Sequence, residues 1–243
     1  MTSLVGDPYN QAGTGTATLE LLESATRYNN WLVSKLTPFL GERNLELGAG
    51  HGTLTALVAN ERKVVASEPA ASGRSVLTHR FASNPKVLSV VKGVDDLPEN
   101  QAFDCVYSAN VLEHVADDAA LIKQAAAVLR VGGHFVAVVP AGRWLYSPFD
   151  QAVGHHRRYG YSDRARLSAA VAGGSAPLKL VAYRHFNPVG AMGWFFRMRM
   201  LRKSEIPATD IERLDSLVPL LQPLDYLPFG FGQSLLFAFV RTS

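Results

Sequence analysis

The stretch of the chain richest in reactive side chains is DQAVGHHRRYGYS, residues 150–162. It contains an acid, adjacent histidines, adjacent arginines and two tyrosines. Histidine suits general-base catalysis because its pKa lies near neutral pH, and Asp150 is close enough in sequence to orient His155 or His156 if the loop folds back. Paired arginines can hold a carboxylate or phosphate through parallel hydrogen bonds. The stretch therefore predicts either an acceptor-facing lid or a polar loop with structural roles.

Several side chains of this region are candidates for the chemistry. We take as candidate catalytic residues His155, His156 and Tyr159. We take as candidate acceptor-binding residues Tyr146, Arg157, Arg158 and His114. Each has a structural alternative, because arginine pairs are often solvated or bound to carbonyls, a tyrosine can simply pack, and His114 can cap the loop that follows it.

A second group of residues, LELGAGHG at 45–52, places three glycines between an apolar run and an amphipathic segment. Glycines there let a ligand approach the backbone, and Glu68, which ends the next apolar run, can accept hydrogen bonds from a ribose. The spacing is G-x-G-x-G, and Thr53 stands where a dinucleotide site has its third glycine. Glu46 would repel a pyrophosphate and attract a cationic aminoacyl group. The loop therefore favours S-adenosylmethionine over NAD, with a tight turn that binds nothing as the alternative.

The elements that must position these residues follow from the hydrophobic pattern. Apolar runs predict strands at 43–48, 63–68, 86–91, 103–108, 134–140, 178–183 and 234–241. Amphipathic spacing predicts helices at 17–36, 53–60, 73–81, 117–130 and 163–172. Gly132 and Gly133 are interpreted as the stop of the fourth of these helices. Alternation of strands and helices predicts an α/β protein with a mostly parallel sheet covered on both faces.

The order of these motifs resembles the class I S-adenosylmethionine-dependent methyltransferases. The matching pieces are NLELGAGHGTLT, ASEPA, GVDDLPE and FDCVYSANVLEHVADDAALIKQAAAVLRVGGHFVAVVPA, which together span about residues 40–141. The segment GHHRRY resembles a Gly-His-x-Arg-Arg-Tyr signature of bacterial methyltransferases. The resemblance implies a Rossmann-like seven-stranded sheet with a reversed last strand, an N-terminal helical cap and a late helical insertion. It implies S-adenosyl-L-methionine as cofactor, with S-adenosyl-L-homocysteine as product.

The resemblance also implies cofactor-binding roles by position. Glu46, Gly48, Ala49 and Gly50 would line the methionine part. Glu68 and Pro69 would contact the ribose and adenine, and Val94 and Asp95 the adenine edge. Asn110 and Val111 would lie near the sulfonium, and Tyr28 with Asn29 would cap the cofactor.

A later segment, residues 189–203, combines aromatic, methionine and arginine residues. Helical spacing puts Trp194, Met198 and Leu201 on one face. This face is interpreted as a cover for the acceptor pocket or for a second copy of the chain, with contact to a membrane surface as the alternative.

Composition and charge set the remaining expectations. The chain has 243 residues, a net charge of +3 and one cysteine, Cys105, which excludes an internal disulfide. We expect a single methyltransferase domain over 1–243, with a cap at 1–40, a cofactor-binding core at 41–141 and an acceptor-side region at 142–243. No signal peptide, membrane insertion, metal site or nucleic-acid partner is expected, and the expected localisation is cytoplasmic.

The sequence thus predicts a methyltransferase acting on a small biosynthetic acceptor, anionic or lipid-like, with O-methylation favoured over N- or C-methylation. A homodimer stays open. Two alternatives also stay open, a non-catalytic cofactor-binding or assembly module on the same fold and an NAD(P)-dependent oxidoreductase.

Overall fold

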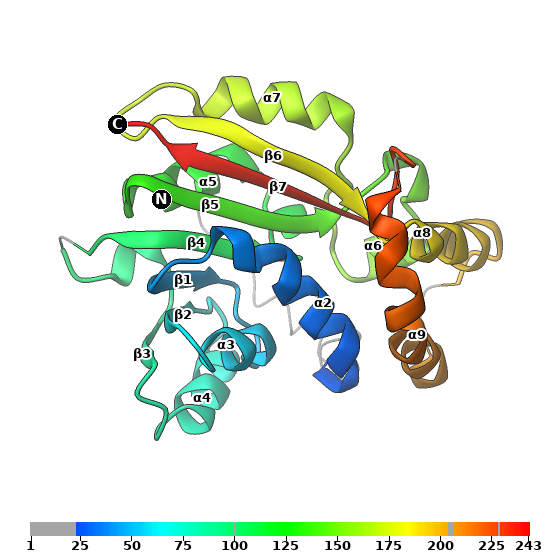
Figure 1. Cartoon of the computed structure of the whole chain (residues 1–243), viewed down its shortest axis with the longest axis horizontal. Helices are drawn as coiled ribbons and strands as arrows, with labels where there is room; N and C mark the ends of the chain where they lie inside the picture. Colours follow the sequence, from blue (N-terminus) through cyan, green and yellow to red (C-terminus); the bar gives the residue numbers. More distant parts are fainter. Residues whose placement is uncertain (1–22, 100, 204–206, 228) are drawn as a thin grey trace.

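A single seven-stranded sheet organises the chain (Figure 1). We describe it from a computed structural model that covers residues 23–243 apart from 100, 204–206 and 228. The strands are β1 (Arg43–Leu47), β2 (Lys63–Ser67), β3 (Val87–Val91), β4 (Phe103–Ala109), β5 (Leu129–Pro140), β6 (Leu178–Phe186) and β7 (Ser234–Arg241). Their order is β3-β2-β1-β4-β5-β7-β6, and β7 runs antiparallel to both of its neighbours. The predicted mostly parallel sheet with a reversed last strand is confirmed.

Helices cover both faces of this sheet, as predicted. One face carries α5 (Asp118–Ala127) and α7 (Tyr161–Val171). The other carries α2 (Thr26–Leu36), α3 (Thr53–Val58) and α9 (Ala208–Leu221), while α4 (Ala71–Arg80) packs beside β2. Successive buried side chains of β5 point to opposite faces of the sheet. Phe135 and Ala137 pack toward α5 and α7, whereas Val136 and Val138 pack toward α2.

The two glycines interpreted as a helix stop instead lie inside β5. The helix ends at Ala127 and the strand starts at Leu129. Gly132 adopts φ 78°, and the register against β4 shifts between Phe103 and Cys105. The glycines therefore accommodate a β-bulge, since a bulge often uses a residue with positive φ.

Residues after β6 form the late helical insertion. It comprises α8 (Pro188–Trp194), the π-helical η5 (Phe195–Met200), α9 and the 3₁₀ turn η6 (Gln222–Tyr226). The predicted apolar face is interrupted, because Met198 is buried whereas Leu201 is 58% exposed. A π-helix has a wider turn than an α-helix, so residues spaced for one α-helical face diverge.

The insertion is tied to the N-terminal helix by acids. Asp225 accepts a hydrogen bond from the Trp31 indole and pairs with Lys35, and Asp215 accepts the Tyr28 backbone N–H. The two segments, far apart in sequence, lie side by side next to the edge where the parallel strands end (Figure 1).

Among the described helices, none combines the length and apolar character that crossing a bilayer requires.

Candidate functional site

The glycine loop joins β1 to α3 at the carboxyl edge of the sheet. Gly48, Gly50 and Gly52 all have positive φ, at 70°, 55° and 87°. A Cβ at Gly48 would lie 2.5 Å from Cγ2 of Val111, so the loop and the residues after β4 are in contact. The backbone N–H groups of Gly48 and Ala49 donate to the Ser67 carbonyl, which fixes the loop against the end of β2. The structure thus places Gly48 and Val111, two of the predicted cofactor-binding residues, in one region.

Glu46 lies inside β1 under this loop and is buried. Its Oε2 accepts hydrogen bonds from the Thr55 hydroxyl at 2.6 Å and the Tyr107 hydroxyl at 2.9 Å. Burial raises the pKa of the Glu46 carboxyl to about 7, opposed by those two hydrogen bonds and reinforced by the charge of Glu68. The carboxyl is thus poised to ionise when a cationic group binds nearby.

This pKa predicts a pH-dependent stability. The pKa of Glu46 in the folded protein, about 7, exceeds the ordinary value of 4.5, so the folded state holds this proton more tightly than the unfolded state does. The contribution of Glu46 to the free energy of unfolding is therefore complete below about pH 4.5 and is lost as pH rises through 7. The full difference is about 3 kcal/mol, or a Tm change of about 6–12 °C for a chain of this size. We compare the Tm of Glu46→Gln with that of wild type by calorimetry at pH 5 and at pH 8. The Tm difference in favour of Glu46→Gln should grow by about that amount from pH 5 to pH 8, because only wild type has a carboxyl at position 46 that must ionise. The exposed Glu61→Gln is the control, and a gap that does not vary with pH would contradict the assignment.

Glu68 does not face open space, unlike the expectation for a ribose-binding acid. It is fully buried, and its two oxygens accept the backbone N–H groups of Gly50 at 2.9 Å and Ala70 at 2.8 Å. A Cβ at Gly73 would lie 2.8 Å from its Cγ. In this structure the Glu68 carboxylate therefore holds the glycine loop, and because a carboxylate has about four lone-pair sites, these two hydrogen bonds do not preclude a further one from a ribose hydroxyl.

The other cofactor-binding candidates lie along the same edge. Pro69 follows Glu68, and Val94 with the exposed Asp95 forms the 3₁₀ turn η2 (Val94–Asp96) after β3. Asn110 follows β4 with φ 54°, a left-handed conformation that a non-glycine residue seldom adopts. Tyr28 lies near the end of β5, since its hydroxyl hydrogen-bonds Ser234, the partner of Pro140.

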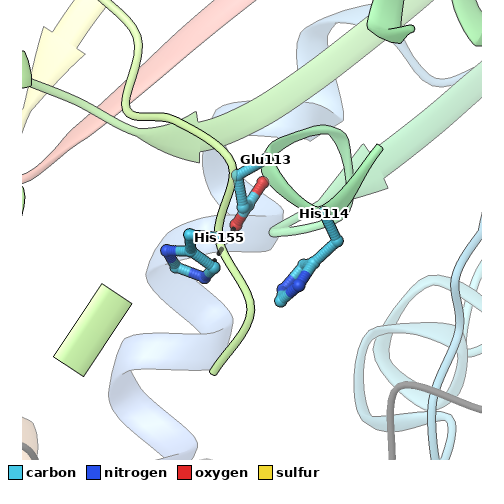
Figure 2. A group of neighbouring side chains, drawn as sticks. All are labelled: Glu113, His114 and His155. Atoms are coloured by element: carbon cyan, nitrogen blue, oxygen red, sulfur yellow. Dashed lines mark ion pairs between the residues drawn. The ribbon is translucent and has the colours of Figure 1, made fainter. Parts of the chain in front are cut away.

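Asp150 and His155 form a hydrogen-bonded pair, as the sequence suggested. Asp150 lies in α6 (Pro148–Ala152), is fully buried, and its Oδ1 lies 2.9 Å from Nδ1 of His155. The other ring nitrogen of His155 lies 3.9 Å from Oε1 of Glu113. His114 stacks edge-on against His155 with ring centroids 4.7 Å apart. Figure 2 shows the three side chains converging from the turn after β4 and from the segment after α6.

Sequence reasoning missed Glu113. It is fully buried in the 3₁₀ turn η3 (Leu112–His114), and among the described residues neither carboxyl oxygen has a hydrogen-bond partner. Burial raises its pKa to about 8, while burial and the neighbouring histidines lower the pKa of His114 to about 4. The available signal was the position of Glu113, directly after a strand end that was already a candidate site.

The structure assigns Tyr159 and Arg158 to packing rather than to ligand contact. Tyr159 is fully buried and donates its hydroxyl to Asp118 at 2.9 Å. Arg158, with its side chain 1% exposed, pairs with Asp150 at 2.7 Å and stacks over the Trp194 ring at 4.5 Å. Both residues hold the segment of residues 150–162 in place. This corrects the catalytic role expected of Tyr159 and the acceptor-binding role expected of Arg158.

Arg157 is half-buried and also has a structural partner set. It donates to the Ala116 carbonyl at 2.6 Å and pairs with Asp118 at 3.0 Å. Asp118 accepts two further hydrogen bonds from Arg166, each 2.7 Å. Arg157 therefore matches the structural alternative considered from the sequence, in which an arginine of the pair is bound to a carbonyl near a helix end.

An open depression of about 860 Å³ lies over this charged network. Its lining residues are Ala116, Asp117, Asp118, Arg143, Tyr146, His156, Arg157, Arg158, Asp163 and Arg166. His156 is exposed at its surface, and the Tyr146 hydroxyl donates to the His155 carbonyl at 2.7 Å. The depression thus adjoins the His155 cluster through residues 146 and 156, and none of its lining residues belongs to the glycine loop.

Comparison with known proteins identifies the segment that carries the glycine loop and β4. Residues 45–137 match the family described as a methyltransferase domain. A curated relative is the ubiquinone biosynthesis O-methyltransferase of Vibrio vulnificus (strain YJ016), 30% identical over 112 residues, which are 43% of this chain and 46% of that protein. A 37.1 kDa uncharacterised protein of Streptomyces fradiae is 30% identical over 127 residues, 50% of this chain and 37% of that one. The chain therefore spans less than half the length of these relatives.

Solved structures extend the likeness over the whole chain. Phosphoethanolamine N-methyltransferase 2 of Haemonchus contortus, in complex with S-adenosyl-L-methionine, superposes with a TM-score of 0.63 at 16% identity, covering 100% of this chain and 61% of that one. This protein has a class I methyltransferase fold. A methyltransferase from Bacillus halodurans C-125 superposes with a TM-score of 0.56 at 18% identity over 86% of this chain and 98% of its own. In a class I methyltransferase fold the glycine loop lies at the carboxyl edge of the sheet, where open α/β sheets bind their ligands.

Proposed function

We propose that this chain is an S-adenosylmethionine-dependent methyltransferase that methylates an oxygen of a small biosynthetic acceptor. The observation that carries the proposal is the glycine loop with positive φ at Gly48, Gly50 and Gly52, within a segment that matches a methyltransferase domain. When bound, the cofactor supplies an electrophilic methyl group.

The residues at this edge fit the cofactor. Gly48 is partly exposed and a Cβ there would collide with Val111, and a buried hydroxyl at the end of β4, that of Ser108, has no hydrogen-bond partner among the described residues. Glu46, with its pKa near 7, provides a negative charge for a cationic aminoacyl group. A pyrophosphate would meet two buried acids, Glu46 and Glu68, which disfavours the nicotinamide alternative.

The acceptor side is assigned to the cluster of Glu113, His114 and His155. Methyl transfer to a hydroxyl requires loss of its proton, and the Asp150–His155 pair holds one imidazole in a fixed tautomer beside the depression. The curated relative is named for O-methylation in ubiquinone biosynthesis, which supports a phenolic hydroxyl as the acceptor group. The likeness of GHHRRY to a bacterial methyltransferase signature supports the same assignment of His155 to the site.

A screen with methyl-labelled S-adenosylmethionine against phenolic and carboxylic small molecules tests the activity. The expected result is label in at least one phenol, abolished by excess S-adenosylhomocysteine. Saturable binding of S-adenosylhomocysteine without transfer to any acceptor would overturn the enzymatic claim and leave a binding module on the same fold.

Glycine at position 48 is expected to be essential for cofactor binding. Gly48→Ala puts a Cβ 2.5 Å from Val111 at φ 70°, where the left-handed conformation alone costs about 1–2 kcal/mol. We expect the Kd for S-adenosylhomocysteine to rise about tenfold or more, measured by calorimetry. Gly174→Ala is the matched control, because Gly174 has φ 94° with nothing within 4 Å of its Cβ position. Equal Kd values for the two variants would show that the loop does not contact the cofactor.

A further inference from the structure

Glu113 presents a buried carboxylate whose two oxygens lack any hydrogen-bond partner among the described residues. Burying an unpaired carboxylate is costly, so buried charges in proteins are paired or coordinate metal ions. The positive charge of Arg158 favours the ionised form of Glu113, but its guanidinium is committed to Asp150 at 2.7 Å, and the ring nitrogen of His155 lies 3.9 Å from Oε1 of Glu113. The carboxylate of Glu113 is therefore available to a further cation.

Two imidazoles face the same point. Single ligand atoms of Glu113, His114 and His155 all lie within 4.8 Å of one another (Figure 2). In a four-coordinate zinc site with bonds of about 2.0–2.1 Å, neighbouring ligand atoms lie about 3.3 Å apart. The cluster would have to close by at most about 1.5 Å, which small side-chain rotations can supply.

The outer nitrogens of both rings are held by acceptors. Nδ1 of His155 lies 2.9 Å from Oδ1 of Asp150, and the ring of His114 hydrogen-bonds the Gly154 backbone. Metal-binding histidines nearly always donate their second N–H to a carboxylate or a backbone carbonyl, which fixes the tautomer and directs the other nitrogen at the metal. His155 thus shows the arrangement expected of a metal ligand, and the His114 ring also has a backbone partner that can fix its orientation.

We propose that Glu113, His114 and His155 bind one divalent transition-metal ion, with zinc as the best match. Two histidines and a glutamate form a donor set of catalytic zinc sites, which keep an open position for water or substrate. The sequence alone does not indicate this site, because His155 is distant in sequence from Glu113 and His114.

The role of this ion rests on the proposed function. An acceptor hydroxyl at the open position would have a lowered pKa, and its proton would leave to solvent before methyl transfer. The depression is lined by His156 and Tyr146, and the Tyr146 hydroxyl bonds the His155 carbonyl, so an acceptor in the depression would lie next to the segment that carries His155.

Metal binding alone tests the proposal, without cofactor or acceptor. The full chain, stripped with a chelator and dialysed, is titrated with Co²⁺ while visible absorption is recorded, and Zn²⁺ affinity is measured by competition with a chromophoric chelator. We expect one ion per chain, with affinity at least about 100-fold lower in Glu113→Gln and in His155→Ala, and about 10–100-fold lower in Asp150→Asn. His185→Ala, which removes a half-buried histidine stacked on Tyr161 and Tyr183, should bind like wild type.

Absence of stoichiometric binding by wild type would overturn the metal site, as would a folded Glu113→Gln with unchanged affinity. Circular dichroism verifies folding, and Glu113→Gln is nearly isosteric, so loss of binding in the folded variant supports the site. Absence of metal binding would not bear on the proposed cofactor binding. Metal binding without S-adenosylhomocysteine binding would contradict only the proposed function.

Discussion

Replacing His155 with alanine is expected to lower kcat by about 10²- to 10⁴-fold, the range of a lost general base. The ring is fixed by Asp150 at 2.9 Å and faces Glu113, so its removal leaves the acceptor hydroxyl protonated whether the ring acts as a base or through a bound ion. The affinity for S-adenosylhomocysteine should stay at its wild-type value, because within the described part of the chain no hydrogen bond or ring contact joins His155 to the glycine loop.

The measurement is a steady-state assay on the acceptor found in the labelled-methyl screen. His185→Ala is the control, because it removes a half-buried histidine outside the cluster, and it should retain kcat. His156→Ala, whose ring is exposed at the depression, should lose less than His155→Ala. Wild-type kcat in both His155→Ala and His156→Ala would exclude histidine from acceptor activation.

The second large effect concerns stability, at the buried pair of Asp150 and Arg158. Breaking a buried ion pair by removing one partner costs about 3–5 kcal/mol, because the other charge stays buried without compensation. Asp150→Ala and Arg158→Ala should each lower Tm by roughly 6–20 °C. Asp150 also accepts the Ser147 N–H and hydroxyl in a capping box, so its variant should be the less stable of the two.

A double-mutant cycle separates the pair from its surroundings. With Arg158→Met as the second single variant, Asp150→Ala/Arg158→Met leaves neither charge of the pair unpaired and lets the apolar side chain keep the stack on Trp194. The double variant should therefore cost at least about 2 kcal/mol less than the sum of Asp150→Ala and Arg158→Met. The exposed pair of Lys63 and Glu42 is the matched control, with an expected cost below about 1 kcal/mol for Glu42→Ala. Additive losses at Asp150 and Arg158 would show that the two charges do not stabilise each other.

The fold was predictable because its signals are local. Continuous apolar runs such as KVVAS mark strands buried on both faces, and the three glycines after β1 specify a turn that few other residues can adopt. The Asp150–His155 contact was foreseeable for the same reason, since the two residues lie within one turn of chain. The bulge at Gly132 and the π-helix of η5 were not, because tertiary packing decides both.

The roles within the lid were not predictable from GHHRRY alone. Arg157 and Tyr159 find their partner in Asp118, at the start of a helix some forty residues earlier, and such a pairing leaves no periodic trace in the sequence. Glu113 is a related case. A glutamate is ordinarily exposed, and only the folded chain shows that this one is buried. Charge in a motif therefore indicates a site less reliably than the burial of that charge.

Titration calorimetry with S-adenosylhomocysteine on the full chain tests the central claim most directly. The account predicts saturable one-to-one binding that Gly48→Ala weakens and Gly174→Ala does not. No saturable binding at high micromolar ligand, with NADH binding in its place, would contradict it.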